Sequence, residues 1–160
     1  MLTLRPITPQ DNPAMARIIR TVMTEYGATG PGYSIHDPEV DRMCETYADD
    51  RSVFYVVENE QGELLGGAGI GPLVGGESSV CELKKMYFLP AARGQGAGHR
   101  MLKQCLEGAK TLGYQRCYLE TLERMPEARR LYARYGFREL TAPMGNTGHN
   151  SCDRFFVIDL

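Results

Sequence analysis

The stretch that decides the fold runs from residue 80 to residue 112 and reads VCELKKMYFLPAARGQGAGHRMLKQCLEGAKTL. Its first ten residues favour a strand, and its middle is a glycine-rich turn. After the turn, apolar residues recur at the spacing of one helix face, namely Met101, Leu102, Cys105, Leu106, Ala109 and Leu112. The sequence therefore predicts a central strand at residues 80–89, a tight turn at 93–98 and an amphipathic helix behind it.

The turn predicts a binding site for phosphate. Gly94, Gly96 and Gly98 alternate behind Arg93, and glycine lets the backbone turn tightly and lets a ligand approach it. A helix that begins at such a turn directs unpaired N–H groups and its positive dipole end outward. The spacing fits neither a P-loop nor a dinucleotide fingerprint, because His99 stands where the third glycine would be. A turn without a ligand is the alternative.

Composition places the chain among ordinary globular proteins. It has 160 residues and a net charge of −2, so we expect a single domain over residues 1–160 and neither nucleic acid nor a membrane as a partner. The five cysteines are scattered without a Cys-x-x-Cys pair, and the N-terminus has no apolar signal core. We therefore expect reduced thiols and a cytoplasmic location. The oligomeric state stays open, with a homodimer as one option.

The rest of the chain predicts an α/β (α+β) fold. Strands are expected near residues 2–7, at 52–58, 64–70, 115–121 and 137–140, and at 152–160. Helices are expected at residues 12–26, from Pro38 to about Tyr47 and at 126–135. This order indicates a mixed, largely antiparallel sheet flanked by helices, with parallel pairing in the two strand–helix–strand units of the second half.

Two motifs resemble the GNAT superfamily of acetyltransferases. The turn fits the family pattern Arg/Gln-x-x-Gly-x-Gly/Ala through Arg93, Gly96 and Gly98. About 40 residues later, EARRLYARYGF at 127–137 is similar to the family segment Ala-x-x-Leu-Tyr-x-x-x-Gly-Phe. The resemblance covers most of the chain. It implies a central sheet that splays into a V and holds acyl-CoA in the opening.

The resemblance also implies the residues that bind the cofactor, acetyl-CoA. Met86, Tyr87 and Phe88 would pair with the pantetheine arm, and the N–H groups from Arg93 through Gly94, Gln95, Gly96 and Ala97 to Gly98 would hold the diphosphate. His99 lies in the same turn and is expected to face solvent or phosphate. Lys84, Lys85, Arg100 and Lys103 would assist with the phosphates, unless they form a solvated face. One departure is Met125, where many members carry a cofactor-binding Asn.

The chemistry requires a base for the amine and an acid for the leaving thiolate. By resemblance, Tyr132 is the acid, with a core aromatic as the alternative. Glu82 is the candidate base; an ordered water, or a strand-edge carboxylate paired with Lys84 or Lys85, is the alternative. In an unbroken strand Glu82 would share its face with Val80, Met86 and Phe88. No metal-ligand spacing links the histidines, so no metal is expected, and Cys152 is predicted to be a buried structural thiol opening the final strand.

The function expected from these residues is transfer of an acetyl group from acetyl-CoA to a small-molecule or amino-acid-like amine by direct attack in a ternary complex. Two alternatives stay open: a non-catalytic acyl-CoA sensor, and an acetyltransferase of protein lysines or N-termini. His36 and His149 lie in loops that the family uses for the amine substrate, although each is more often an ordinary loop residue. The identity of that substrate is not encoded in a recognisable motif.

Overall fold

A computed structural model describes residues 1–123, 125–149 and 151–160. In these residues seven strands form one sheet in the order β1-β2-β3-β4-β5-β7-β6. The strands are β1 (Thr3–Pro6), β2 (Val53–Glu58), β3 (Leu64–Pro72), β4 (Val80–Phe88), β5 (Arg116–Thr121), β6 (Arg138–Leu140) and β7 (Arg154–Asp159). Every neighbouring pair is antiparallel except β4–β5, which is parallel. The mixed, mostly antiparallel sheet was predicted correctly.

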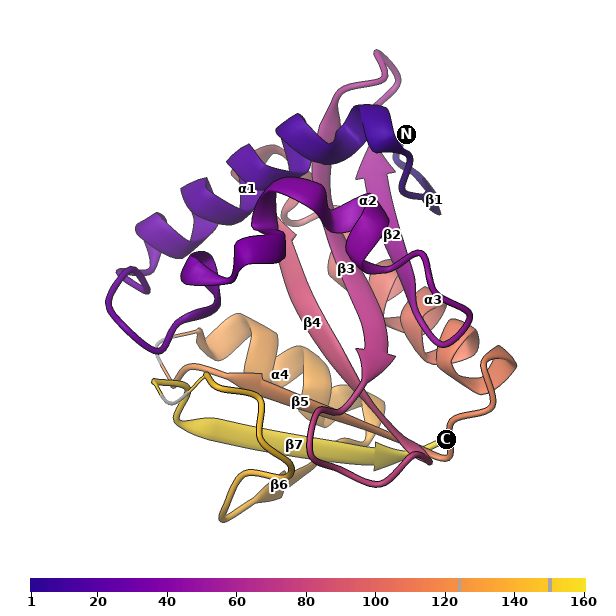
Figure 1. Ribbon diagram of the computed structural model, residues 1–160. Helices are drawn as coiled ribbons and strands as arrows, with labels where there is room; N and C mark the ends of the chain where they lie inside the picture. Colours follow the sequence, from indigo (N-terminus) through magenta and orange to yellow (C-terminus); the bar gives the residue numbers. More distant parts are fainter. Residues whose placement is uncertain (124, 150) are drawn as a thin grey trace.

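Helices cover both faces of this sheet, as Figure 1 shows. α1 (Asn12–Glu25) and α2 (Met43–Thr46) lie over one face, where Met15, Ile19 and Met43 pack with Phe54 and Val56 of β2. α3 (Ala97–Thr111) covers the other face, and its apolar stripe packs against residues of β3, β4 and β5. α4 (Pro126–Tyr135) lies behind β5 and contributes to the same core through Tyr132.

The sheet opens between its two parallel strands. β4 and β5 pair only over Val80 to Glu82 and Arg116 to Tyr118, where their first residues meet. Beyond Glu82 the two strands diverge, and α4 lies beside the opening (Figure 1). The second half of β4 is thus left without a hydrogen-bonded strand on the β5 side. This is the predicted V.

A bulge interrupts β4 at Lys85. Gly69 pairs with Lys84 and Gly67 with Tyr87, so Ala68 faces two residues of β4, and Lys85 adopts a positive φ of 58°. The extra residue reverses the alternation of side chains that follow it. Met86 and Phe88 therefore pack with Leu83 in the core beneath α3, and Glu82 points to the opposite face. The expectation that Glu82 shares its face with Met86 and Phe88 is wrong for this reason.

Three smaller expectations also need correction. The helix expected from Pro38 is a 3-10 segment, η3 (Pro38–Arg42), followed by the single turn of α2. β6 does not pair with β5, because β7 inserts between them and pairs with both. The final strand begins at Arg154, so Cys152 lies in the loop before it.

Two sequence-level expectations concern the thiols and the membrane. All five cysteines are free, and Cys81, Cys105 and Cys117 are fully buried. Among the described residues, no helix combines the length and the apolar character that crossing a bilayer requires.

Candidate active site

The first cavity, here called the turn cleft, lies in front of the N-terminus of α3. It is lined by the glycine turn, by Met86, Tyr87 and Phe88 of β4 and by residues of α4 that include Leu131 and Tyr132, and it encloses about 390 Å³. Most of the residues that the sequence analysis assigned to the cofactor line this one cavity, namely Met86, Tyr87, Phe88, Arg93, Gly94, Gly96, Ala97, Gly98 and His99. The turn and the open end of β4 therefore face the same space.

Unpaired amides point from the turn. The N–H groups of Ala92 and Arg93 donate to the carbonyls of Leu89 and Pro90, so they are already satisfied. From Gly94 to His99, no described residue accepts a hydrogen bond from the backbone N–H groups, and the first helical bond is from Arg100 to Gly96. No side chain caps α3. The amides free for an anion thus begin at Gly94, one residue later than the sequence suggested.

The glycines serve two different ends. Gly94 and Gly96 both have a φ of 76°, a conformation that L side chains rarely adopt, and a Cβ there would meet no atom within 4 Å. At Gly98 the constraint is space, because a Cβ would lie 3.3 Å from Leu131 Cδ2 across the cleft. The turn requires glycine for its backbone shape, whereas Gly98 lets α4 approach α3.

The side chain of Arg93 ties this turn to the rest of the fold. Its Nε and Nη2 donate to the carbonyl of Phe88 at 3.1 and 2.9 Å, and Nη1 and Nη2 hold the carboxylate of Glu25 on α1 at 2.7 and 2.8 Å. The basic residues around the turn do not form one cluster. Arg100 donates to the carbonyl of Leu2, and Lys85 lies buried in an ion pair with Asp37.

The residues at the edge of the turn are also tied down. The side-chain amide of Gln95 donates to the carbonyl of Ala91. The tilted rings of His99 and Tyr135 lie 4.9 Å apart between centroids, and the Tyr135 hydroxyl donates to the His99 carbonyl. Tyr135 therefore joins α4 to the start of α3.

A second, smaller cavity adjoins the turn cleft and is here called the carboxylate pocket. It contains Glu82 of β4, Glu120 of β5 and His149, and offers about 60 Å³ of free space. Met86, Tyr87, Met125, Ala128 and Tyr132 line both cavities. Two compartments therefore meet at one wall, with a backbone-lined cleft on one side and carboxylates on the other.

Glu82 is buried and uncompensated in this pocket. Only 2% of the residue is exposed, and no described residue forms an ion pair or a hydrogen bond with its carboxylate. Burial raises its pKa to about 7; Lys84 opposes this shift and Glu120 adds to it. The titratable groups around it are Lys84, Lys85, Tyr118, Glu120, His149, Cys152 and Tyr47. The proposed pairing with Lys84 or Lys85 is not formed, because Lys85 pairs with Asp37 instead.

Asp37 links Lys85 and His149, two residues that line the carboxylate pocket. Its Oδ2 accepts a hydrogen bond from Lys85 Nζ at 2.7 Å and lies 2.8 Å from His149 Nε2. Burial alone would raise the pKa of Asp37, but the hydrogen bond from His149 and the charge of Lys85 outweigh it and lower the pKa to about 2. An ionised Asp37 therefore fixes both the bulged lysine and the ring of His149.

Tyr132 lies where the two cavities meet. It is 6% exposed and packs against Phe137 and Phe156 at centroid distances of 5.7 and 6.0 Å. Burial raises the pKa of its hydroxyl, so the group stays protonated at neutral pH. Tyr132 is therefore both a core aromatic and part of the wall that the two cavities share.

Sequence reasoning did not identify several residues that build the pocket or support it. They are Glu120 of β5, Lys85 of β4 and Asp37 in the loop before η3, and no motif marks them. Glu120 follows Tyr118, the strand partner of Glu82, by two residues, so it shares the face of Glu82 once the parallel pairing is known. Cys152 lines the pocket and is partly buried, and burial raises its thiol pKa to about 12. His36 lies outside both cavities and contacts the carbonyl of Thr29.

Comparison with known proteins identifies the family of the chain. Residues 16–137 match the model of the Acetyltransferase (GNAT) family. YjgM of Escherichia coli, an uncharacterized N-acetyltransferase, is 46% identical over 151 residues, which cover 94% of this chain and 90% of that protein. C1271.07c of Schizosaccharomyces pombe, also an uncharacterized N-acetyltransferase, is 28% identical over 130 residues, with 81% and 78% covered.

Solved structures share the fold at low identity. An acetyltransferase of the GNAT family from Staphylococcus aureus superposes with a TM-score of 0.88 at 18% identity, covering 100% of this chain and 99% of that one. The yncA protein of Salmonella typhimurium, solved with its cofactor acetyl-CoA, gives 0.77 at 21% identity, with 100% and 94% covered. The matched family model and these relatives show that the chain belongs to the GNAT family and is an N-acetyltransferase.

Proposed function

We propose that this acetyltransferase uses acetyl-CoA as its donor and acts on the amine of a small-molecule or amino-acid-like substrate. The observation that carries the proposal is the shared wall of the two cavities. Tyr132, Met86 and Tyr87 border both the turn cleft and the carboxylate pocket. A thioester in the cleft would therefore end beside a buried carboxylate, which is the pairing that acyl transfer to an amine requires.

The turn cleft suits the donor. The free amides from Gly94 to His99, at the N-terminus of α3, favour binding of a diphosphate. The second half of β4 offers its unpaired backbone groups to an extended amide arm. Two structural neighbours were solved with acetyl-CoA, yncA and a phosphinothricin acetyltransferase of Sinorhizobium meliloti (TM-score 0.77, 22% identity). We assign Met86 to Phe88 and the turn from Arg93 to His99 to this ligand.

The two titratable side chains take complementary roles in the proposal. Glu82 has a pKa of about 7, so its carboxylate accepts a proton near neutral pH. Tyr132 keeps its proton and would give it to the departing thiolate. The amine nitrogen forms the new C–N bond while the C–S bond breaks, and both substrates are held in one complex rather than passing through an acyl-enzyme.

Two alternatives make different predictions. An acyl-CoA sensor would bind the donor without turnover. A buried Glu82 without an ion-pair partner destabilises the fold, and donor binding alone does not require that residue. An enzyme for protein lysines needs an open groove for the peptide, whereas the carboxylate pocket offers only about 60 Å³ of free space. The small pocket favours a slender amine. Donor binding alone does not separate these cases.

The test has two parts. Calorimetric titration with acetyl-CoA and with free CoA measures donor binding, and an amine panel assayed by thiol release measures transfer. We expect saturable donor binding and turnover with at least one small primary amine. Donor binding without turnover on any amine would favour the sensor, and the absence of donor binding would overturn the proposal.

A further inference from the structure

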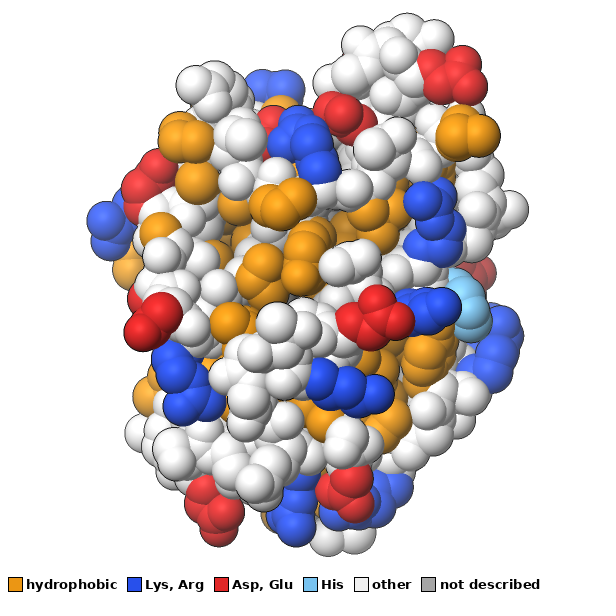
Figure 2. Space-filling view, turned by 90° about the vertical axis from the view of Figure 1, so that its right-hand side faces the viewer, with side chains coloured by type: hydrophobic (Ala, Val, Ile, Leu, Met, Phe, Trp, Pro, Cys, Tyr) orange, Lys and Arg blue, Asp and Glu red, His pale blue; other side chains and the backbone are white. Residues whose placement is uncertain are grey.

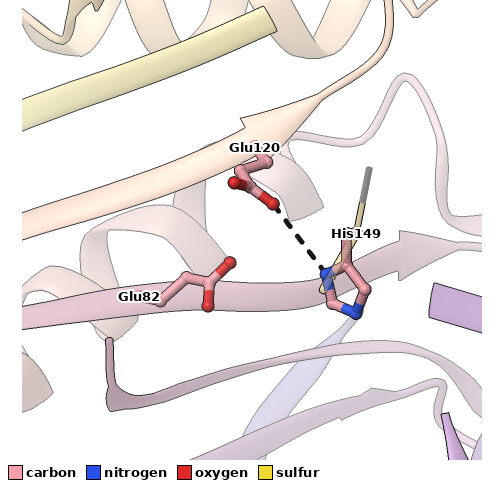
Figure 3. Close-up of side chains that lie close together, drawn as sticks. All are labelled: Glu82, Glu120 and His149. Carbon is pink, nitrogen blue, oxygen red and sulfur yellow. Dashed lines mark ion pairs between the residues drawn. The ribbon is translucent and has the colours of Figure 1, made fainter. Parts of the chain in front are cut away.

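Three electron-rich atoms converge in the carboxylate pocket from three separate parts of the chain. Glu82 comes from β4, Glu120 from β5 and His149 from the loop before β7, as Figure 3 shows. One ligand atom of each lies within 4.8 Å of those of the other two, and Nδ1 of His149 is 3.9 Å from Oε1 of Glu120. The three atoms surround one small space.

No direct ion pair compensates Glu82 in this space. The Glu120 side chain is 5% exposed, and it accepts hydrogen bonds from Thr147 Oγ1 and Tyr118 Oη, each at 2.7 Å. Only 2% of Glu82 is exposed, and none of the described residues donates a hydrogen bond to its carboxylate or forms an ion pair with it. Lys84 and Lys85 lower its pKa only from a distance, and Lys85 is paired with Asp37. Two desolvated carboxylates thus lie close together with Glu82 unpaired, which favours a cation that fits between them.

His149 adds a third ligand atom to those of the two carboxylates. Its Nε2 lies 2.8 Å from Oδ2 of the ionised Asp37, and a carboxylate only accepts, so Nε2 carries a hydrogen. Nδ1 is the ring nitrogen that faces Glu120, 3.9 Å from its Oε1 (Figure 3). With Nδ1 unprotonated, the pocket offers three acceptors at this point.

Spacing separates an ammonium from a metal ion. Around an ammonium, charge-assisted hydrogen bonds of about 2.8 Å at tetrahedral angles place acceptors about 4.6 Å apart. Around Zn²⁺, bonds of about 2.1 Å place the ligands only about 3.4 Å apart. The separations here, 3.9 Å for one pair and up to 4.8 Å overall, admit the ammonium as the side chains stand and would require them to close in on a metal.

We propose that the amine substrate binds as a primary ammonium whose three N–H groups are received by Glu82, Glu120 and His149. This rests on the proposed function and names its substrate class. The ammonium gives one proton to the Glu82 carboxylate, and the freed nitrogen lone pair attacks the thioester carbon. As the C–S bond breaks, the thiolate takes a proton from Tyr132, and the nitrogen gives its second proton to the resulting Tyr132 phenolate, which leaves a neutral amide and restores the hydroxyl.

The surroundings define the rest of the substrate. Met23, Leu122 and Met125 line the same pocket, so the carbon next to the ammonium lies against apolar side chains. A quaternary ammonium has no N–H group to donate, and an alcohol has no charge to balance the carboxylates. The class is therefore a primary alkylamine with an unbranched or slender carbon chain.

Equilibrium binding to the CoA-saturated enzyme tests this directly, with n-butylamine, 1-butanol and butyltrimethylammonium as probes. We expect butylamine to bind at least about tenfold more tightly than either analogue. In the Glu120→Gln variant, butylamine should bind about tenfold more weakly and KM for the best panel amine should rise, with CoA affinity unchanged. Glu123→Gln is the matched control, because Glu123 is 63% exposed and pairs with Arg154 outside the pocket.

Each outcome decides the proposal. Equal binding of the three probes, including no binding by butylamine, would overturn it, and so would an unchanged KM in Glu120→Gln. Loss of activity in EDTA that Zn²⁺ or Mn²⁺ restores would replace the ammonium site by a metal site. Failure of wild-type enzyme to acetylate any amine would instead count against the proposed function, so the two failures are distinguishable.

Discussion

The turn cleft and the carboxylate pocket share a wall, yet they are built in opposite ways. The cleft takes its polar groups from the backbone of one continuous stretch, the amides between Gly94 and His99. The pocket takes its polar groups from the side chains of Glu82, Glu120 and His149, which come from three separate segments, and Asp37 of a fourth segment holds His149. A backbone site depends on local conformation, whereas a side-chain site depends on how the whole sheet is assembled.

This difference also separates what each compartment tolerates. In the turn, a side-chain substitution affects the amides only where it changes the local conformation, as at the glycines or at Arg93. Any change among the buried charges alters the balance of the pocket. On the side of the molecule drawn in Figure 2, acidic and basic side chains are interspersed around an apolar centre.

The largest expected effect is at the shared wall. Tyr132→Phe removes the proton donor and leaves the ring packed between Phe137 and Phe156. We expect kcat to fall by about 10²-fold or more, with the dissociation constant of acetyl-CoA nearly unchanged. Steady-state kinetics and calorimetry give the two numbers. Tyr114→Phe, which removes a buried hydroxyl bonded to the Arg51 carbonyl far from the wall, should leave kcat intact. An unchanged kcat in Tyr132→Phe would remove the assigned role.

The Glu82→Gln variant tests whether the Glu82 carboxylate sets the pH dependence of activity and stability. Because the carboxylate must be ionised to take a proton, wild-type kcat/KM should rise as pH passes through about 7, and the variant should lose this limb with an activity about 10²-fold lower. The free energy of unfolding of the wild type should instead fall as pH rises. A pKa raised from 4.5 to about 7 by burial means that the wild type loses stability as pH rises through 7.

The melting temperature reports this second effect of Glu82→Gln. The difference between variant and wild type should be more favourable to the variant at pH 8 than at pH 5, by several degrees, since about 1 kcal/mol shifts Tm by about 2–4 °C at this chain length. A difference independent of pH would contradict the raised pKa.

Asp37→Asn tests the support of the pocket. Within the described part of the chain, the remaining ion-pair partner of Lys85 would be Glu39 at 3.9 Å, so its buried charge is left poorly compensated. We expect a loss of about 3 kcal/mol in the free energy of unfolding and a raised KM for the amine. Denaturant titration measures the loss. Asp41→Asn is the control, because Asp41 and its ion-pair partner Arg20 are 68% and 48% exposed and solvent screens the pair, so we expect little change in the free energy of unfolding.

The smallest effect is expected in the cleft. Gly96→Ala adds a side chain where φ is 76°, which strains the backbone by about 1 kcal/mol and shifts the amides. Acetyl-CoA should bind about fivefold to tenfold more weakly, measured by calorimetry. Gly113→Ala places the same strain after the far end of α3, at a φ of 90°, and should leave the dissociation constant unchanged. Equal effects at both glycines would show that the cleft does not depend on the turn.

Sequence reasoning reached the cleft and only part of the pocket, and particular residues show why. Arg93, Gly96 and Gly98 form a contiguous pattern whose meaning is local, so the turn and the helix behind it were predicted correctly. Glu82 and Tyr132 were found through motif position. Glu120, Asp37 and Lys85 carry no local signal, because each acts in the site through partners 29 or more positions away in the chain.

What the sequence by itself determined is the order of elements, the amphipathic faces, the glycine turn and the family, since periodicity and turn chemistry act within a few residues. Tertiary structure alone decided the bulge at Lys85, which turns Met86 and Phe88 away from Glu82, and the insertion of β7 beside β5. It also decided that Glu120 and His149 meet a buried, unpaired Glu82 in one pocket. Such a cluster forms only when strands distant in sequence bring their side chains into the same desolvated space.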